Sequence, residues 1–201
     1  MNPKHSSLTN GRRPRRWLRR MFLVLLLFAA WRLIDGLGLI PDFQRNSLPI
    51  VGLHPTVEKK SKELVELAAK KGIRVVITTD FRSIEEQNRL YRQGRDSKGK
   101  VVTNAEGGES YHNYGLAIDF ALQDKAGNVL WDMERDNNKN GKTDWLEVAE
   151  LAKGLGFSWG GDWKQFPDFP HLQMDFGYTI SRLKSGHYPK GSLTEKQSQD
   201  A

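Results

Sequence analysis

The sequence contains no cysteine among its 201 residues, so no disulfide bond can stabilise the fold. Long apolar runs are also scarce, and the longest uninterrupted one is Met21–Trp31 near the N-terminus. Any folded domain must therefore be held by its own hydrophobic core, for which a hydrophobic content of 38% is sufficient. The length leaves room for one ordinary domain with appendages and excludes two large ones.

A basic face of the kind that binds nucleic acid is missing as well. The formal net charge is +7, but residues 1–40 hold eight of the 31 Lys and Arg and only one of the 24 Asp and Glu. The remainder of the chain therefore carries 23 charges of each sign. Because phosphate binding needs basic side chains on the folded body, this distribution predicts no nucleic-acid partner.

The excess positive charge marks a membrane-targeting segment in residues 1–40. A basic cluster, Arg12–Arg20, runs directly into the apolar residues, and Trp17–Ile40 is long enough to span about 30 Å of hydrocarbon. No Ala-x-Ala cleavage site follows, which favours an uncleaved signal anchor over a cleaved signal peptide. Positive charge keeps the N-terminal side in the cytoplasm, so a single-pass protein with residues 41–201 outside the membrane is expected, or a secreted protein if cleavage occurs.

The rest of the chain divides into a linker (41–55), a domain (56–190) and a polar tail expected to be disordered (191–201). Periodicity, capping and glycine positions predict helices over Thr56–Lys71, Ser83–Gly94 and Asp144–Leu155, and strands over Ile73–Thr79, Gly115–Leu122 and His171–Phe176. These elements alternate irregularly and without a βαβ rhythm. They predict an α+β domain in which helices flank a small antiparallel sheet.

Two predicted strands each place a potential metal ligand opposite an apolar face. In 116–122 the large apolar residues alternate with Ala117, Asp119 and Ala121, and in 171–176 they alternate with His171 and Gln173. His112 enters from the loop before the first strand. Two imidazoles and a carboxylate suit Zn²⁺, which keeps a fourth position for water in catalytic sites. We therefore predict a zinc site at His112, Asp119 and His171, the alternative being unrelated polar residues on a solvated sheet face.

A second candidate cation site lies in residues 136–147, DNNKNGKTDWLE. This segment fits the EF-hand template D-x-[DN]-x-[DN]-G-x₅-E at every specified position. Two features depart from an EF-hand: Thr143 stands where an aliphatic residue is usual, and 129–135 looks like strand and turn and not like an entering helix. The segment is therefore either a Ca²⁺ site or a solvated turn rich in Asn and Gly.

Two motifs resemble the paired zinc motifs of the M15 peptidases: S-x-H-x-x-G-x-A-x-D over Ser110–Asp119 and D-x-P-H over Asp168–His171. That family includes VanY-type D,D-carboxypeptidases and the L-alanyl-D-glutamate endopeptidases of bacterial walls and phage endolysins. Further segments resemble the endopeptidase branch, and the likeness covers about residues 53–175. These segments are Leu53–Pro55, Thr79–Arg82 with Gln87 and Leu90–Arg95, and Trp159–Trp163. The resemblance implies a Hedgehog/DD-peptidase-like fold.

Two further residues would turn a metal site into a hydrolytic one. Asp168 lies three residues before His171, so its carboxylate can reach the open side of the metal and act as general base and then acid, a role that the resemblance also implies. The alternative for Asp168 is a turn cap ahead of Pro170. Arg82, directly after a predicted strand, is implied by the resemblance to stabilise the oxyanion or to anchor a substrate carboxylate. Ser110 and Gln87 are predicted to hydrogen-bond the substrate.

Other residues that stand out in the sequence receive no catalytic role. Trp159 and Trp163 either wall a cleft or pack beside glycine turns, and His54 and His187 are expected on the surface.

The resemblance implies a zinc peptidase that cuts the peptide stem of bacterial peptidoglycan between L-Ala and D-Glu. The choice of bond rests on the resemblance alone, so a D,D-carboxypeptidase that releases D-Ala remains an alternative. A zinc-bearing wall-binding domain without catalysis is the rival from another class. The expected partners are the stem peptide and, through residues 1–40, the membrane, and the protein is expected to be a monomer.

Overall fold

The structure, a computed structural model, describes residues 49–96 and 98–194. The predicted membrane anchor of residues 1–40, the first part of the predicted linker and residues 195–201 of the predicted tail lie outside these ranges. Within the described ranges, no helix combines the length and the apolar character needed to cross a membrane.

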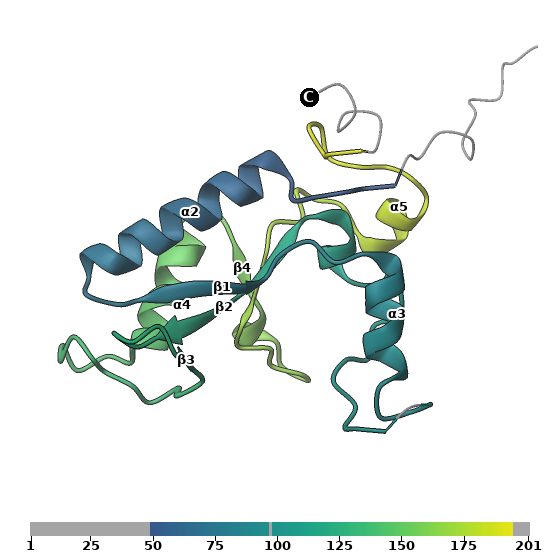
Figure 1. The fold of residues 1–201 in the computed structure, drawn as a ribbon. Coiled ribbons are helices and arrows are strands. Elements are labelled where there is room, and N and C mark those ends of the chain that lie inside the picture. Colours follow the sequence, from purple (N-terminus) through teal and green to yellow (C-terminus); the bar gives the residue numbers. More distant parts are fainter. Residues whose placement is uncertain (1–48, 97, 195–201) are drawn as a thin grey trace, which may run out of the picture. The chain divides into compact units, whose positions relative to one another are not determined.

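An antiparallel sheet of five strands carries the domain (Figure 1). Its strands are β1 (Val75–Thr79), β2 (Ala117–Gln123), β3 (Val129–Leu130), β4 (Ser158–Trp159) and β5 (His171–Gln173). The order across the sheet is β1-β2-β5-β4, and β3 pairs with β2. The long strand β2 is therefore central, which confirms the predicted α+β class with a small antiparallel sheet.

Two helices pack on the sheet and enclose the main core. These are α2 (Pro55–Lys70) and α4 (Asp144–Gly154), which also contact each other. Leu64 of α2 and Val148 of α4 are fully buried, and the ring of Trp145 lies 4.9 Å from that of Phe120 on β2. Each such large apolar side chain contributes about 1.5–3 kcal/mol by leaving water. This packing holds the sheet whose strands β2 and β5 carry Asp119 and His171.

The predicted phase of β2 is confirmed for Ile118, Phe120 and Leu122, which are all buried in the main core. Leu116 differs, because β2 begins one residue later. Leu116 instead belongs to a second apolar cluster of buried residues. Its members are Ile50, Tyr114, Leu116 and Leu183.

The domain also extends beyond its predicted boundaries at both ends. Ile50, which lies in the predicted linker, is 8% exposed and forms a bridge with Thr194 of the predicted tail. His54 is buried and not on the surface: its Nδ1 accepts the Thr56 N–H at 3.2 Å and its Nε2 lies 3.0 Å from the Lys190 carbonyl oxygen. Both ring nitrogens are satisfied, which makes the burial possible.

All three helices predicted from the sequence are present, with small shifts at their ends. The helix α3 (Ile84–Arg92) begins after Ser83, whose hydroxyl accepts the Glu86 N–H as its sequence spacing predicts. Two differences are larger. The strand expected over 171–176 ends at Gln173, and Phe176, three residues later, has a positive φ of 51°, which is not a strand conformation. A short helix, α5 (Ile180–Lys184), follows where no element is predicted, since five residues are too few to show a helical period.

Candidate metal centre

Strand pairing brings two of the predicted ligands together. β2 and β5 are antiparallel neighbours, and their register places Asp119 directly opposite His171. Side chains in such positions have Cβ atoms about 5 Å apart on the same face of the sheet. His112 comes from a short 3₁₀ helix, η1 (Tyr111–Tyr114), which leads into β2. The structure thus brings together the three residues named from the sequence.

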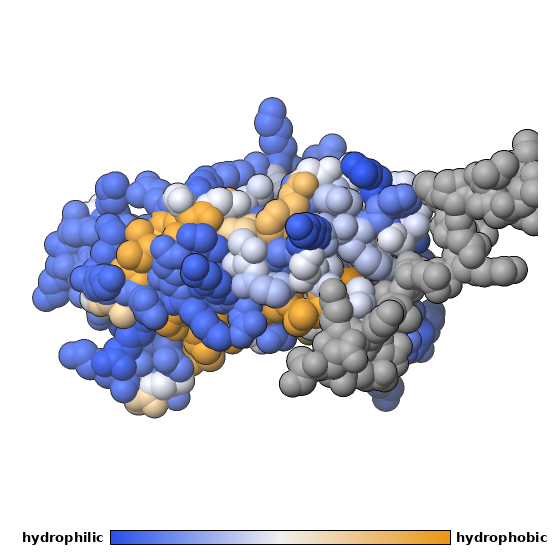
Figure 2. All heavy atoms as spheres, turned by 90° about the horizontal axis from the view of Figure 1, so that it is seen from above, coloured by the Kyte–Doolittle hydropathy of each residue, from blue (hydrophilic) through white to orange (hydrophobic). Residues whose placement is uncertain are grey.

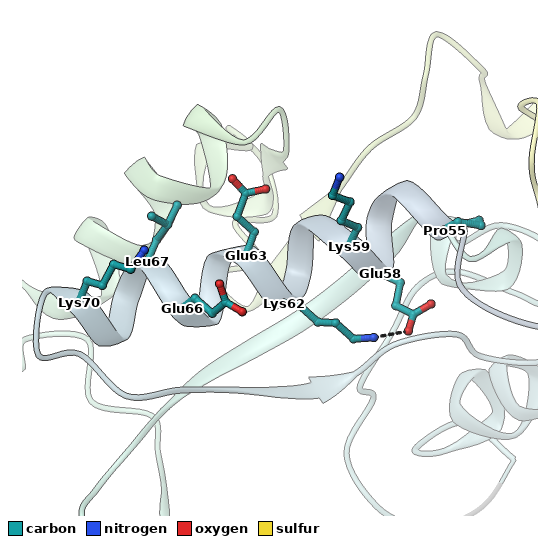
Figure 3. A pocket seen from close by; sticks show the side chains of 8 residues that line it. All are labelled: Pro55, Glu58, Lys59, Lys62, Glu63, Glu66, Leu67 and Lys70. Carbon is teal, nitrogen blue, oxygen red and sulfur yellow. Dashed lines mark hydrogen bonds and ion pairs between the residues drawn. The ribbon is translucent and has the colours of Figure 1, made fainter.

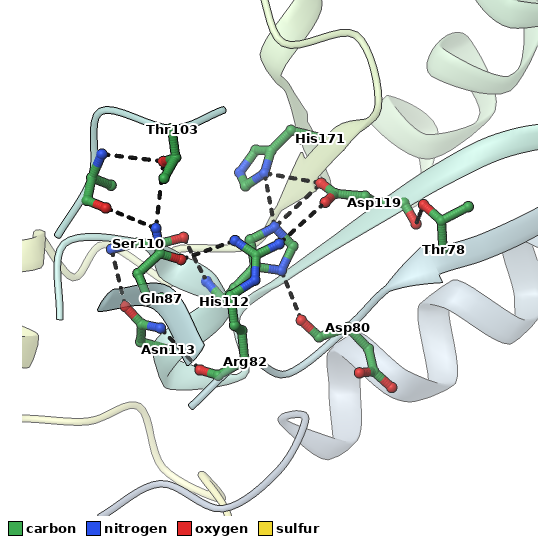
Figure 4. Close-up of polar contacts among 11 residues, drawn as sticks. Thr78, Asp80, Arg82, Gln87, Thr103, Ser110, His112, Asn113, Asp119 and His171 are labelled. Carbon is green, nitrogen blue, oxygen red and sulfur yellow. Dashed lines mark hydrogen bonds and ion pairs between the residues drawn. The ribbon is translucent and has the colours of Figure 1, made fainter. Parts of the chain in front are cut away.

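The three ligand-type atoms converge on one point (Figure 4). Nε2 of His112 and Nδ1 of His171 lie 3.2 and 3.4 Å from Oδ1 of Asp119, and 3.2 Å from each other. Both imidazoles are almost fully buried. Across residues 49–96 and 98–194, no other group of three His, Asp or Glu residues has its ligand atoms within 4.8 Å of one another.

The outward-facing nitrogen of each imidazole is held by a hydrogen-bond acceptor. Nδ1 of His112 lies 2.7 Å from the Asp80 carbonyl oxygen, and Nε2 of His171 lies 3.0 Å from Oε1 of Gln173. A carbonyl oxygen can only accept, so these nitrogens carry the protons. The lone pairs then remain on the two nitrogens that face each other, which is the arrangement of metal-binding histidines.

These contacts test whether the site suits a cation. Two nitrogen lone pairs and a carboxylate oxygen within 3.4 Å of one another repel unless a positive charge lies between them. Burial by itself would raise the pKa of Asp119, but with no cation bound, protons on the inward nitrogens of His112 and His171 would hydrogen-bond its carboxylate and hold that pKa well below its usual range. The carboxylate is therefore ionised, and the donor set fits Zn²⁺.

Arg82 lies beside this group and is held by Gln87. One guanidinium nitrogen donates to Oε1 of Gln87 at 2.9 Å, and the other lies 3.8 Å from Oδ2 of Asp119. Gln87, predicted to bind the substrate, is fully buried, and its Nε2 donates to the carbonyl oxygen of Ala105 at 2.8 Å. With both ends of its amide engaged, Gln87 is placed to position Arg82 and not to touch a substrate.

Ser110 caps η1 and also lines the cleft around the candidate metal site. Its hydroxyl accepts the His112 N–H at 3.4 Å, and the Asn113 side chain completes a capping box. The same Asn113 amide donates to the Arg82 carbonyl oxygen at 2.9 Å. Asn113 is not among the site residues predicted from the sequence, although a polar residue three positions after Ser110 fits the spacing of a capping box. This pair therefore ties the ligand His112 to the segment that carries Arg82.

Asp168 lines the same cleft as His112, Asp119 and His171. Backbone hydrogen bonds from Asp168 to Gly160 and from His171 to Asp168 form the turn that brings it there. Burial raises the pKa of Asp168, and the positive charge of a protonated His171 would oppose that shift. The side chain remains accessible to solvent, so it can exchange protons with water.

The cleft has a volume of about 1030 Å³ and extends well beyond the three ligands. Residues 102–105 line it after α3, and the segment before β5 lines it with Trp163 and Phe166. The Trp163 ring lies 5.1 Å from that of His171, so this tryptophan walls the site. Trp159 instead is buried, and its indole N–H donates to the Phe169 carbonyl oxygen at 2.7 Å.

A second hollow, of about 610 Å³, runs along the outer face of α2 (Figure 3). Its lining alternates acidic and basic side chains, and Lys62 lies 2.6 Å from Glu58. The face of the molecule seen from above is mainly hydrophilic, with apolar side chains showing between the polar ones (Figure 2). Charges of both signs on an exposed helix are typical of a solvated surface, and the hollow lies apart from the metal ligands.

Comparison with known proteins assigns the chain to a family. The model of an M15 peptidase family, described as D-alanyl-D-alanine carboxypeptidase, matches residues 103–174. Over 122 residues the chain is 66% identical to the peptidoglycan L-alanyl-D-glutamate endopeptidase CwlK of Bacillus subtilis, a match that covers 61% of this chain and 73% of CwlK. The chain belongs to the M15 family of peptidases. The M15 motifs found in the sequence, Ser110–Asp119 and Asp168–His171, are thus the segments that build the metal centre.

More distant relatives were also found. The L-alanyl-D-glutamate peptidase of Listeria phage A118 is 30% identical over 145 residues, and the match covers 72% of this M15 chain and 46% of the phage protein. Among solved structures, the L-Ala D-Glu endopeptidase ChiX of Serratia marcescens is 23% identical with a TM-score of 0.39, covering 63% of this chain and 91% of ChiX. DacB of Streptococcus pneumoniae is 18% identical with a TM-score of 0.48, covering 74% and 84%.

Proposed function

We propose that this M15 peptidase is zinc-dependent and hydrolyses the bond between L-Ala and D-Glu in the peptide stem of bacterial peptidoglycan. The observation that carries the proposal is the convergence of His112, Asp119 and His171 on one point, in a cleft that also holds Asp168 and Arg82. The identity of 66% to CwlK, which is described as an L-alanyl-D-glutamate endopeptidase, supports the choice of bond.

The metal would be held by Nε2 of His112, an oxygen of Asp119 and Nδ1 of His171. Zn²⁺ in such a site lowers the pKa of a bound water toward about 7 and polarises a carbonyl group. Asp80 and Gln173 orient the two imidazoles through their outer nitrogens. That orientation keeps both lone pairs directed at the metal position without rearrangement during the reaction.

Asp168 moves the protons in this proposal. Its carboxylate accepts a proton from the attacking water and then donates it to the amine nitrogen that leaves. The scissile bond breaks between the carbonyl carbon and that nitrogen, so one water is consumed and two new termini appear. Arg82, fixed by Gln87, donates hydrogen bonds to the oxygen on which negative charge develops.

A D,D-carboxypeptidase is the second candidate, because the matching family model carries that description. Such an enzyme must anchor the terminal carboxylate of its substrate. Among the described residues that line the cleft, Arg82 alone carries a permanent positive charge, and it lies against Asp119. One guanidinium group cannot bind both the terminal carboxylate of a substrate and the oxyanion. This favours an endopeptidase, which cuts within the chain and binds no terminal carboxylate.

Product analysis tests the proposal. The purified zinc-loaded protein is incubated with muropeptides, and new termini are identified by mass spectrometry. We expect products that end in L-Ala and products that begin with D-Glu. Free D-Ala would support the carboxypeptidase instead, and binding to cell walls without any product would support a domain that only tethers.

We also propose that residues 1–40 anchor the protein in the membrane with the peptidase domain outside. The basic cluster before the apolar stretch supports this orientation. Peptidoglycan, the proposed substrate, lies on that side. After cell fractionation, the full-length chain should remain with the membranes after carbonate washing. A shortened chain recovered from the medium would instead indicate that the segment is cleaved.

A further inference from the structure

The loop between β3 and α4 contains an arrangement that the peptidase activity does not use. Residues 136–147, here called the 136–147 loop, match all specified positions of the EF-hand template. Gly141, at the template's glycine, has a φ of +83°, which supplies the sharp turn that the template requires at this position. The helix α4 begins at Asp144, so Asp144 and Glu147 lie one turn apart at its start, where the exiting helix of an EF-hand carries its last ligands.

Asp144 supplies an independent indication of a ligand. Its side chain is 2% exposed, and Oδ2 accepts the Asn137 N–H of the loop at 3.1 Å and lies 3.9 Å from Nε of Arg135. Oδ1 is buried and has no hydrogen-bond partner in the part of the chain that the structure describes. A buried carboxylate oxygen left without a partner is costly, and a bound cation would remove that cost.

Glu147 is the second buried carboxylate of the loop and is also 2% exposed. Nδ2 of Asn138 donates to Oε2 at 2.8 Å, and Nζ of Lys71 lies 3.0 Å from Oε1. Asp136 accepts the N–H groups of Asn140 and Gly141, which curls the loop. Glu147 is therefore paired with the ammonium group of Lys71 in this structure. Ca²⁺ would have to displace that group from Oε1.

We propose that the 136–147 loop binds Ca²⁺. Its ligands would be the side chains of Asp136, Asn138, Asn140, Asp144 and Glu147 and the carbonyl oxygen of Lys142. All six ligand atoms would be oxygens, a set that suits Ca²⁺ better than the smaller Mg²⁺, which keeps several of its waters. The ion would tie the loop to the start of α4 through Asp144 and Glu147, in a domain that has no disulfide bond to stabilise it.

The expected affinity is weak. Only three of the six ligands are carboxylates, and Lys71, Lys139 and Lys142 lie in or beside the loop, so their charge opposes a divalent cation. We expect a dissociation constant of about 10⁻⁴–10⁻³ M, as in extracellular calcium modules. Ca²⁺ binding at this loop is measured through heat and stability without any substrate, so it is tested independently of the peptidase activity.

Calorimetric titration of the zinc-loaded full-length protein with CaCl₂, after removal of free metal, tests the site. We expect one saturable binding event, and a rise in Tm of about 2–5 °C at 5 mM Ca²⁺ that the same concentration of Mg²⁺ does not reproduce. The absence of saturable heat up to 10 mM Ca²⁺ would overturn the proposal. An equal response to Mg²⁺ would also overturn it, because it would indicate general screening of charge.

Three variants locate the site. Asp136→Ala removes the first ligand from a partly exposed position and should weaken Ca²⁺ binding at least 10-fold, as should Glu147→Gln. Glu66→Gln is the matched control, since Glu66 is an exposed acid on α2 outside the template and its loss should leave the affinity unchanged. Should Glu147→Gln fail to fold, Asp136→Ala decides: unchanged affinity in that variant would place the ion elsewhere and overturn the proposal.

Discussion

At the scale of single residues, Asp168 is the proposed general base and acid beside the candidate metal site. Its carboxylate lines the cleft but does not belong to the three converging ligands. We expect Asp168→Asn to lower kcat by about 10²–10⁴-fold, the usual contribution of a general acid and base, while zinc content and Tm stay unchanged. Muropeptide turnover and metal analysis on one preparation measure both quantities.

The matched control for this variant is Asp162→Asn, which changes an exposed acid paired with Lys153. It should retain full activity. An unchanged kcat in Asp168→Asn would remove Asp168 from the mechanism, whereas loss of zinc would make it a ligand.

Gln87 is predicted to act through Arg82. Replacing it with Met keeps the volume but removes the acceptor for Arg82 and the donor to Ala105. We expect kcat/KM to fall about 10-fold, mainly through kcat, because one hydrogen bond to a charged group is worth about 1.5–3 kcal/mol and the oxyanion is stabilised only in the transition state. Kinetics across substrate concentrations separate kcat from KM.

Asn88 provides the control for this prediction, since it lies on the same helix and accepts the Gly107 N–H without contacting Arg82. Asn88→Ala loosens the same loop region. Equal losses of kcat in both variants would assign the effect of Gln87 to the loop and not to the position of Arg82.

At the scale of elements, the junction between η1 and β2 depends on Gly115. This residue has a φ of +65°, and a Cβ atom there would lie 2.1 Å from the Gly52 carbonyl oxygen. We expect Gly115→Ala to lower the free energy of unfolding by about 2–4 kcal/mol, because left-handed strain and a backbone clash add. Chemical denaturation measures the change.

Gly127→Ala is the matched variant, with a φ of +89° but no atom closer than 4.0 Å to the added Cβ. It should cost only the conformational strain, about 1 kcal/mol. Equal destabilisation by the two substitutions would show that the approach of Gly52 has no part in the effect.

The elements themselves could be predicted where a local pattern exists. Ser83 with Glu86 marks the start of α3, and alternation in 118–122 identifies the buried face of β2. The helix α5 shows no such pattern because it is only five residues long. The predicted strand over 171–176 ends early, at Gln173, and the positive φ of Phe176 beyond it has no counterpart in the hydrophobic pattern.

At the scale of the whole molecule, stability should fall in alkali through Tyr114. Its hydroxyl donates to the Gly108 carbonyl oxygen at 2.9 Å inside the second apolar cluster, and burial raises its pKa to about 12. Between about pH 10 and 12 the unfolded chain has lost this proton and the folded chain retains it. The contribution of this group to the free energy of unfolding is therefore fully present below about pH 10. It decreases as pH rises from about 10 to about 12.

Urea unfolding at several pH values checks this expectation. Tyr114→Phe should be about 1 kcal/mol less stable at pH 8, through loss of one hydrogen bond, but should decline less steeply above pH 10. The same slope in both proteins would show that Tyr114 does not control the alkaline loss.

The sequence by itself determined the residue types and their phase: His112, Asp119 and His171 as ligands, Asp168 before the last of them, and Arg82 after a strand. These features are local, since alternation and motif spacing reflect only neighbours along the chain. The tertiary structure decided what depends on distant segments. The pairing of β2 with β5 sets Asp119 opposite His171, and the fold brings the carbonyl oxygen of Asp80 to the outer nitrogen of His112. The inner nitrogens of His112 and His171 lie 3.2 Å apart although these residues are 59 positions apart in the sequence, and only the packing of the core fixes such geometry.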